Sequence, residues 1–432
     1  MVDYNSSETN TKCVYAHGAV CVSTDGFVKP CCHLKIGKTK PPYWTQNHRE
    51  HPWWKSLLHN LDNGIKDERC QKCWDLEDLD NPSMRMNTSG NYSHHAVVNT
   101  TPWSYVDLKL GSKCNLMCNM CDANVSSLIA KEQWENVNEK WLKKSATNDI
   151  NKDWSPYVKE GRAWREYKRA GFTDELQWWQ NPKFYDKIKE NAKDIRTLKF
   201  TGGEPTLIPQ VHEIMDYMLE SGHADHINIV ITTNGTYKGT DIYEKMCRFK
   251  SARVNLSVDG TGAVYNYIRY PHTWNRWENN TKKLIELCKG SARLGRGYQG
   301  KIKLGYQFTT SIFNLFNIRE MEDWIHTTGG YDNGMTINYH ANYVYNPKWQ
   351  NIRYLSWDTL DRAVVYLKGG KRISGDVIRF IWGGEDISDE EKMQEMNNLK
   401  YDTELKDRIR VKRPNWDTID NDMLRLKDIM YG

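Results

Sequence analysis

The stretch WSYVDLKLGSKCNLMCNMCD, residues 103–122, joins a strand pattern to a group of three cysteines. Apolar side chains recur at every second position up to residue 110, which predicts a β-strand with one buried face. Cys114, Cys118 and Cys121 follow, so their thiols are expected on the loop at the carboxyl end of this strand. A structural zinc site takes four ligands, and a disulfide takes two cysteines. Three thiols therefore predict a metal centre in which a distant residue completes the set or one position stays open.

Five further segments have a similar apolar strand pattern, and helix-like segments separate them. These strands are expected at residues 195–200, 227–233, 252–258, 301–308 and 335–341. One of the helix patterns between them is PQVHEIMDYMLESG, residues 209–222. Alternation of strands with helices predicts βαβ units and a parallel sheet. Six strands favour an α/β fold of the partial (β/α)6 barrel type, in which chemistry is expected at the carboxyl ends of the strands.

Composition restricts the partners and the compartment. The chain of 432 residues has 39% hydrophobic residues, enough for two or three domains, and a net charge of +5. This charge is too evenly balanced to indicate a nucleic-acid partner. The start is polar, without a signal-peptide pattern, and no run reaches the about 18 apolar residues of a membrane span. A cytoplasmic protein with no membrane partner is therefore expected. Eleven cysteines in such a chain indicate metal or redox chemistry rather than a disulfide framework.

Residues that can bind a ligand also follow the ends of the later strands. The motif FTGGEPTL, residues 200–207, comes at the end of the second strand, TTNGT of the third, NLSVDG and then YNYIRYP of the fourth, and TTSIFN of the fifth. The residues concerned are Gly202, Gly203, Glu204, Asn234, Ser257, Asp259, Arg269, Ser311 and Asn314. Since the carboxyl ends of parallel strands meet at one edge of a sheet, these residues are expected near the three thiols.

The spacing Cys-x3-Cys-x2-Cys after the first barrel strand, with Gly-Gly-Glu-Pro after the second, resembles the signature of radical S-adenosylmethionine (radical SAM) enzymes. The resemblance implies a [4Fe–4S] cluster held by Cys114, Cys118 and Cys121, with an open iron that binds the amine and carboxylate of SAM. It also implies that an electron from the cluster cleaves SAM to methionine and a 5′-deoxyadenosyl radical, which abstracts hydrogen from a substrate. From the residues alone, a zinc site completed by a remote histidine stays an alternative.

The resemblance gives roles to the residues after the second and third strands. Glu204 is expected to accept hydrogen bonds from the SAM ammonium, and Asn234 to lie at the same rim. Gly202 and Gly203 are expected to let the backbone approach the ligand closely, because they have no side chain. Met120, between the last two cysteines, is expected to pack on the adenine.

The resemblance extends to the fourth and fifth strands. Ser257 with Arg269 resembles a pair that holds the SAM ribose and carboxylate in peptide-modifying members, and a guanidinium suits a carboxylate geometrically. Asp259 is placed with them as a cofactor-binding residue. Ser311 and Asn314 resemble residues that contact the adenosine side of SAM.

A second group of cysteines lies near the amino terminus. The segments are CVYAHGAVCVSTDGFVKPCCHLK, residues 13–35, with a Thr-Asp-Gly hairpin signal, and DERCQKCWDLE, residues 67–77. Two pairs of cysteines would suit a zinc ribbon. The whole arrangement resembles the auxiliary-cluster module of twitch and SPASM radical SAM proteins, although in the best-known members that module follows the barrel. The resemblance implies a second [4Fe–4S] cluster on Cys13, Cys31, Cys70 and Cys73, with Cys32 and Cys21 as alternatives to Cys31.

These features predict three parts. Residues 1–100 are expected to form the small α+β auxiliary-cluster module and residues 101–350 the barrel. A helical insertion rich in Trp, Lys and Arg, about 122–194, interrupts the barrel and is expected to be a packed cap. Residues 351–432 are expected to form a helical C-terminal extension, because acidic residues begin and basic residues end the segment 388–410, as the helix dipole favours.

The expected function is that of a radical SAM enzyme acting on a peptide or protein side chain. Its cofactors would be SAM and two [4Fe–4S] clusters, and a reducing protein such as a flavodoxin or ferredoxin would be a partner. One alternative is a twitch-type enzyme that oxidises an alcohol in a small molecule. Another is a non-catalytic iron–sulfur or zinc scaffold, which would have no need of a SAM pocket.

The sixth strand ends in NYHANYVYNP, which suggests a residue for proton or hydrogen transfer. His340 can move a proton near neutral pH, and Tyr339 can donate a hydrogen atom to a product radical. Neighbours on a strand point to opposite faces, so only one of these two can face the cavity.

Overall fold

The computed structural model describes residues 11–35, 39–78, 83–86, 101–135, 178–291, 302–330, 337–383 and 387–410. Within these residues the chain forms one eight-stranded sheet with the order β2-β1-β3-β4-β5-β6-β7-β8. The strands are β1 (Ala19–Val22), β2 (Val28–Lys29), β3 (Tyr105–Lys109), β4 (Thr197–Thr201), β5 (Asn228–Thr233), β6 (Ser251–Ser257), β7 (Ile302–Thr310) and β8 (Ile337–Tyr343). From β3 to β8 every neighbouring pair is parallel, so the six predicted strands and their parallel order are confirmed.

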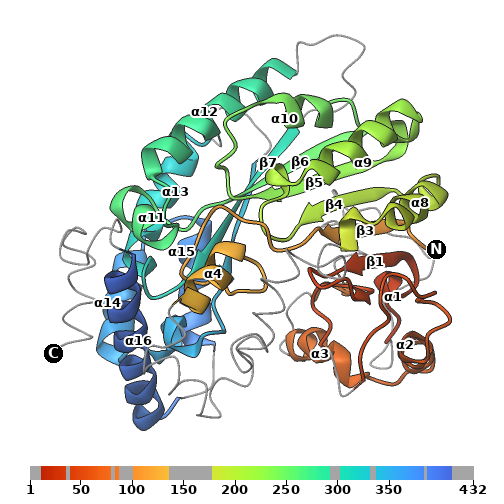
Figure 1. The fold of residues 1–432 in the computed structure, drawn as a ribbon. Helices are drawn as coiled ribbons and strands as arrows, with labels where there is room; N and C mark the ends of the chain where they lie inside the picture. The colour runs from red at the N-terminus through yellow and green to blue at the C-terminus, as the bar shows by residue number, and fades with distance from the viewer. Residues whose placement is uncertain are drawn as a thin grey trace.

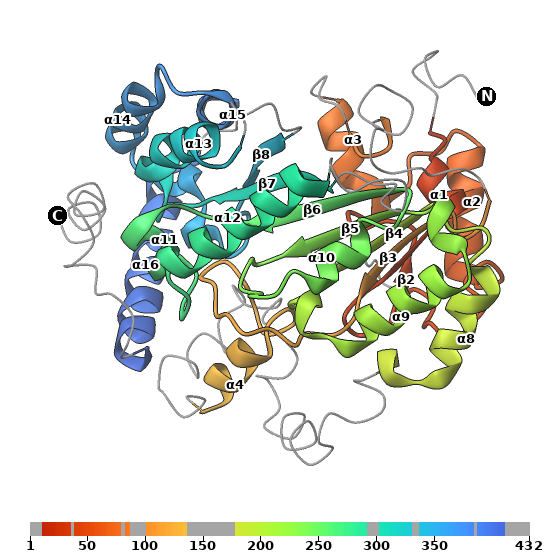
Figure 2. The ribbon, with the colours of Figure 1, turned by 90° about the horizontal axis from the view of Figure 1, so that it is seen from above.

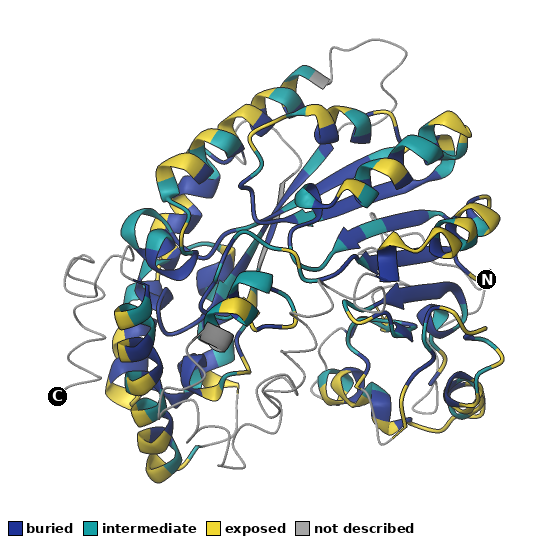
Figure 3. Ribbon diagram, in the orientation of Figure 1, coloured by how far each residue is buried: buried dark blue, intermediate teal, exposed yellow. Residues whose placement is uncertain are grey.

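Helices cover the convex face of this curved sheet (Figure 1). They are α8 (Pro182–Asn191), α9 (Pro209–Glu220), α10 (Asp241–Met246), α11 (Gly262–Ile268), α12 (Trp274–Ser291) and α13 (Ile318–Thr327). The view from above shows α9, α10 and α12 lying over the strands (Figure 2). In α9 the buried residues Val211, Ile214, Met215 and Met218 have the spacing of one helix face. Strands and inward helix faces therefore form a continuous core (Figure 3).

The amino-terminal segment is part of the same sheet. β1 pairs in parallel with β3, from Ala19 opposite Tyr105 to Val22 opposite Leu108, and β2 pairs antiparallel with β1. The predicted hairpin is confirmed, and Gly26 takes the positive φ of 84° that its turn requires. Helices α1 (Val14–Gly18), α2 (Pro52–Asp62) and α3 (Gln71–Glu77) surround it. The alternating pattern predicted six barrel strands, and the hairpin extends that sheet by two.

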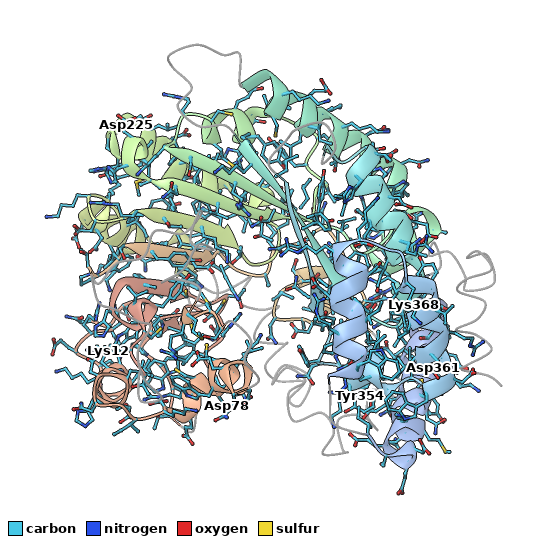
Figure 4. The ribbon with its side chains drawn as sticks, turned by 180° about the vertical axis from the view of Figure 1, so that it is seen from behind. Lys12, Asp78, Asp225, Tyr354, Asp361 and Lys368 are labelled. Atoms are coloured by element: carbon cyan, nitrogen blue, oxygen red, sulfur yellow. The ribbon has the colours of Figure 1, made fainter. Side chains whose placement is uncertain are left out.

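The C-terminal part is helical as predicted, as far as the described residues extend. It contains α14 (Trp357–Leu367), α15 (Arg372–Trp382) and α16 (Asp389–Ile409), and α15 packs on β8 and α13. Ser388 caps α16 by accepting a hydrogen bond from the Glu391 amide at 3.2 Å. In the view from behind, the amino-terminal segment and the C-terminal helices lie at opposite ends of the curved sheet (Figure 4). Lys12 and Asp78 are labelled on the first, and Tyr354, Asp361 and Lys368 on the second.

Two parts of the chain bear on expectations stated above. The predicted insertion begins with α4 (Ser127–Glu135), but residues 136–177 lie outside the described part of the chain, as do residues 411–432. In the part that is described, no helix is both long and apolar enough to span a bilayer.

Candidate active site

The carboxyl ends of β3 to β7 meet at one edge of the sheet, and the predicted site residues lie on the loops that leave this edge. Backbone hydrogen bonds join the first two loops directly. The amide of Gly203 donates to the Gly111 carbonyl at 3.2 Å, and the amide of Glu204 donates to the Lys113 carbonyl at 2.8 Å. The Gly-Gly-Glu element is thus attached to the segment that leads into Cys114.

The three thiols of the cysteine loop, residues 111–122, come together. The side chains of Cys118 and Cys121 interact with each other, and Cys114 interacts electrostatically with both. Burial raises the pKa of Cys114 to about 12, whereas the interaction with Cys121 lowers the pKa of Cys118, helped by the nearby Arg269 guanidinium. The cysteine loop thus places the three thiols near one another, and the cluster that they were expected to hold stays a prediction.

The groups beside the thiols are N–H donors. Arg269 Nη1 donates toward Cys118 Sγ at 3.8 Å, and Asn234 Nδ2 donates toward Cys114 Sγ at 3.8 Å. Within the residues that the structure describes, no three His, Cys, Asp or Glu side chains are arranged to hold a single metal ion. Thiolates with N–H donors around them suit an iron–sulfur cluster, because hydrogen bonds to the sulfurs stabilise its negative charge. The residues present therefore fit the group that the motif implies.

Gly202 and Gly203 pack against the backbone of the cysteine loop. A Cβ atom at Gly203 would lie 2.3 Å from the Lys113 carbonyl oxygen. Gly202 has a φ of 114°, and a Cβ there would lie 3.1 Å from the Gly111 carbonyl oxygen. The space that these glycines leave is therefore occupied by the backbone of the cysteine loop, and close packing of the two loops is what requires them.

Glu204 is fully buried and connects the loops after β4 and β5. Its Oε1 accepts hydrogen bonds from the amide and hydroxyl of Thr206, at 3.1 and 2.7 Å, and from the Thr233 hydroxyl at 2.7 Å. Its Oε2 accepts one bond, from the Asn234 amide at 2.6 Å. Burial raises the pKa of this carboxyl despite these bonds. A carboxylate oxygen has two lone pairs, so Oε2 keeps capacity for one more donor.

Arg269 and Asp259 form a buried ion pair at the end of β6. Arg269 Nε and Nη2 lie 2.7 and 2.6 Å from Asp259 Oδ2, and the Thr309 amide donates to Asp259 Oδ1 at 2.8 Å. The carboxylate that the guanidinium was expected to bind in SAM thus has a counterpart within the chain. Arg269 links the cysteine loop, through Cys118, to the ends of β6 and β7.

The residues after β7 divide into two kinds. Asn314 donates to the carbonyls of Asp259 and Thr309, at 3.1 and 2.8 Å, and accepts from the Ser311 amide at 2.8 Å. Both of its N–H groups thus bind backbone carbonyls, so Asn314 fixes the conformation of this loop. Ser311 Oγ is buried and has no hydrogen-bond partner among the described residues, so it retains capacity for a ligand. Ser257 is half-buried on the same rim.

Two residues that follow the last strand, Gln350 after β8 and Arg410 after α16, hold the cysteine loop from the other side. Gln350 Nε2 donates to the Asn119 carbonyl at 2.8 Å, and Arg410 Nη1 donates to the Met117 carbonyl at 3.0 Å. Arg410 also binds both oxygens of Glu132 in α4, at 2.6 and 2.7 Å, and is 2% exposed. Sequence reasoning missed this clamp, since a basic residue at the end of α16 is sufficiently explained by the helix dipole. Met120, on the same loop, is half-buried against the core.

The amino-terminal thiols form a second group. One pocket is lined by Cys13 before α1, Cys31 after β2, and Cys70 and Cys73 at the start of α3, with His33 and Arg85 beside them. Cys21 lies in β1, where its thiol donates to the Pro30 carbonyl at 3.7 Å, and Cys32 does not line the pocket. Burial raises the pKa of Cys13 to about 11. The four cysteines expected from the sequence are thus brought together, with Cys31 rather than Cys32 facing the pocket.

Of the two alternatives at the end of β8, Tyr339 points toward the helices. Its hydroxyl is 3.0 Å from His326 Nε2 of α13, and the side chain is buried under the helices. A tyrosine in this position does not face the concave side of the sheet, so the catalytic role expected for Tyr339 is not supported. His340 pairs in register with Gln307, and its side chain lies outside the part that the structure describes.

Comparison with known proteins identifies the central part of the chain. Residues 108–294 match the family model described as the radical SAM superfamily, which confirms the radical SAM domain expected from the sequence for this part of the chain. The AdoMet-dependent heme synthase of Methanosarcina barkeri is 35% identical over 80 residues, which are 18% of this chain and 21% of that protein. The chain thus matches only about a fifth of the length of this curated relative.

Solved structures show weaker likeness. Streptococcus suis SuiB bound to S-adenosylmethionine has a TM-score of 0.35 at 13% identity, over 76% of this chain and 60% of that chain. SuiB bound to its precursor peptide SuiA has a TM-score of 0.33 at 14% identity, over 61% and 45%. The structure titled native anSMEcpe with bound AdoMet has a TM-score of 0.31 at 15% identity, over 65% and 61%. At these TM-scores the likeness adds nothing to the fold described above.

Replacing Gly203 by alanine tests the packing of the two loops. The new Cβ would lie 2.3 Å from the Lys113 oxygen, so the loops must separate. We expect a loss of about 1–3 kcal/mol in stability, as for overpacked sites, and a lower iron content after anaerobic reconstitution. Gly290→Ala is the matched control, since nothing lies within 4 Å of its Cβ. Equal iron content in Gly203→Ala and the wild type would contradict the packing role.

Replacing Arg410 by methionine tests the C-terminal clamp. Glu132 then loses its guanidinium partner and the cysteine loop loses a donor, and breaking a buried pair costs about 3–5 kcal/mol. We expect a lower melting temperature and faster loss of iron to a chelator, with partial rescue in Arg410→Lys. Arg362→Met, which breaks an exposed pair with Asp358, should change neither quantity. Wild-type iron retention in Arg410→Met would show that the loop does not depend on the clamp.

Proposed function

We propose that this protein is a radical SAM enzyme that acts on a peptide or protein side chain. The observation that carries the proposal is the convergence of Cys114, Cys118 and Cys121 at the carboxyl edge of the sheet, with N–H donors directed at two of the sulfurs. When bound there, a [4Fe–4S] cluster supplies the electron that cleaves SAM to methionine and a 5′-deoxyadenosyl radical. The match of residues 108–294 to the radical SAM superfamily supports this proposal.

The chain itself would hold and orient SAM through groups that keep hydrogen-bonding capacity. Glu204 Oε2 can accept a bond from the SAM ammonium, because it accepts only one within the chain. Ser311 Oγ can bind the adenosine side, because it is buried without a partner in the described residues. Arg269 has N–H groups beyond those used by Asp259 and Cys118 and can bind the SAM carboxylate. Ser257, Asp259, Asn234 and Met120 complete the proposed site by position.

The amino-terminal pocket would hold the auxiliary cluster. Cys13, Cys31, Cys70 and Cys73 line it, which are the four residues that a twitch-like module requires. Ring contact between Tyr15 of the pocket and Tyr105 of β3, at 5.3 Å, attaches this module to the sheet. An auxiliary cluster there would accept the second electron of a substrate oxidation. A reducing protein such as a flavodoxin or ferredoxin would supply the electron that reduces the SAM-binding cluster.

A second candidate function is oxidation of an alcohol in a small molecule. The auxiliary pocket favours it equally, since a two-electron oxidation needs an acceptor whatever the size of the substrate. The resemblance of Ser257 and Arg269 to peptide-modifying enzymes is the reason to place the peptide first.

Release of 5′-deoxyadenosine tests the proposed activity. Anaerobically reconstituted protein with dithionite and SAM is expected to release it slowly, even without substrate, and chromatography measures the product. The variant with Cys114, Cys118 and Cys121 all replaced by alanine should release none, because three thiolates are needed to hold the cluster that binds SAM. The variant with Cys247 and Cys288 replaced, two cysteines buried in the core, is the control. Equal release from the triple variant would refute the proposal.

Iron content tests the two-cluster assignment. The wild type is expected to hold about eight irons per chain, and removal of either cysteine set should leave about four. Cys32→Ala should keep about eight, because Cys32 does not line the pocket. Stoichiometric zinc at the amino-terminal cysteines would overturn the auxiliary-cluster assignment while leaving the SAM site unaffected.

A further inference from the structure

The concave face of the sheet carries a row of charged residues. Strand register places Asp107, Lys199, Val230, Arg253 and Lys303 side by side on β3 to β7. The residues next to them along each strand are buried in the core with the helices: Val106, Leu198, Ile229, Val254 and Leu304. Because neighbours on a strand point to opposite faces, the charged row lies on the face opposite to the one that the described helices α8 to α13 cover.

Arg253 has no partner within the described residues. It is 9% exposed, and its buried Nε lacks a hydrogen-bond acceptor. The carboxylate in its row is already used, since Asp107 binds Lys199 at 3.1 Å and Thr201 at 2.9 Å. Burial alone lowers the pKa of Arg253 to about 10, so the guanidinium stays charged at neutral pH.

Arg253 differs from the other buried arginines of the described residues, because each of those has a carboxylate partner. Among the residues that the structure describes, four arginines are buried. Arg69 binds Asp67, Arg269 binds Asp259 and Arg410 binds Glu132, each at 2.6 Å. A buried charge without a partner is unfavourable, because water is removed and nothing replaces it. The row contains three cations and one carboxylate, so among the described residues it carries a net positive charge around Arg253.

We infer that Arg253 anchors a carboxylate of the substrate on the concave face of the sheet. A guanidinium binds a carboxylate through two parallel hydrogen bonds, which supplies both the missing charge and the missing acceptor. The inference rests on the proposed function, because it takes the concave face as the place where substrate meets the radical. An acidic peptide residue and a small carboxylic acid have the same chemistry here.

Position along the strand sets the shape of such a substrate. Ser257, at the edge where the cysteine loop lies, is four residues further along β6 and on the same face, about 13 Å away at the rise of a strand. The anchored carboxylate would thus lie deep in the sheet, and the reacting carbon near its carboxyl edge. Val230, next to Arg253 in the row, offers apolar contact for the chain between them.

The first measurement compares melting temperatures without ligand or reductant. Arg253→Met should melt at a higher temperature than the wild type, because an apolar side chain of similar length replaces an unpaired buried charge. Arg362→Met, on the exposed face of α14, should leave the melting temperature unchanged. A lower melting temperature for Arg253→Met would count against an unpaired guanidinium and hence against the inference.

The second measurement adds anionic probes. Glutarate at high concentration should raise the melting temperature of the wild type by about 2 °C, and its neutral match glutaramide should not. The acetylated peptide amide Gly-Gly-Glu-Gly-Gly, compared with its Gln counterpart, tests the peptide source in the same way. A rise in melting temperature with glutarate alone would identify the substrate as a small acid. A rise with the Glu peptide would identify it as a peptide. Inorganic phosphate is a further arm, and protection by phosphate but by neither carboxylate would overturn the assignment.

Variants of Arg253 show whether the carboxylates raise the melting temperature by binding to this residue. Arg253→Met should lose the response to the carboxylates, and Arg253→Lys, which keeps the charge without the planar fork, should retain only part of it. An equal response in the wild type and Arg253→Met would overturn the inference. No radical chemistry enters this assay, so its failure is read separately from a failure to release 5′-deoxyadenosine.

Discussion

The shape of the cysteine loop depends on hydrogen bonds from segments far away in the sequence. Its carbonyls at Lys113, Met117 and Asn119 accept bonds from Glu204, Arg410 and Gln350. Its amides at Met117 and Asn119 donate to the carbonyls of Tyr270 and Ile268, at 2.7 and 3.0 Å. The loop therefore takes its conformation only when β4, α11 and the C-terminal helices are all in place. Convergence of the thiols is a consequence of the whole fold rather than of the loop sequence.

Buried ion pairs complete this arrangement. Asp259 with Arg269 joins the ends of β6 and β7 to Cys118, and Glu132 with Arg410 joins α4 and α16 to the same loop. Such pairs add little net stability, since removing charges from water offsets their attraction. Breaking one leaves an uncompensated charge, so each pair favours one arrangement of the segments strongly. In this protein both pairs fix the surroundings of the thiols.

The six barrel strands could be predicted because alternation is a local pattern, visible in segments such as 103–110 and 252–258. The pairing of β1 with β3 could not be predicted, because β1 (Ala19–Val22) has only four residues and its sequence does not indicate which strand it pairs with. Alternation also showed that Tyr339 and His340 point to opposite faces, but not which of them faces the helices. The glycines at 202 and 203 were expected to make room for a ligand, but the sequence does not show that Gly203 lies against the Lys113 backbone and Gly202 against that of Gly111 and Lys109.

Motif position alone does not separate residues that bind a ligand from residues that position a loop. Asn314 and Ser311 occupy the same motif, but the amide of Asn314 is used by the backbone while Ser311 Oγ has no partner in the described residues. Arg269 and Arg253 are both buried, but within the described part of the chain only Arg269 has a carboxylate partner. A buried polar group without a hydrogen-bond partner costs free energy, and a bound ligand that supplies the partner removes this cost. The hydrogen-bonding capacity left over after folding is therefore the better guide to where SAM and substrate bind.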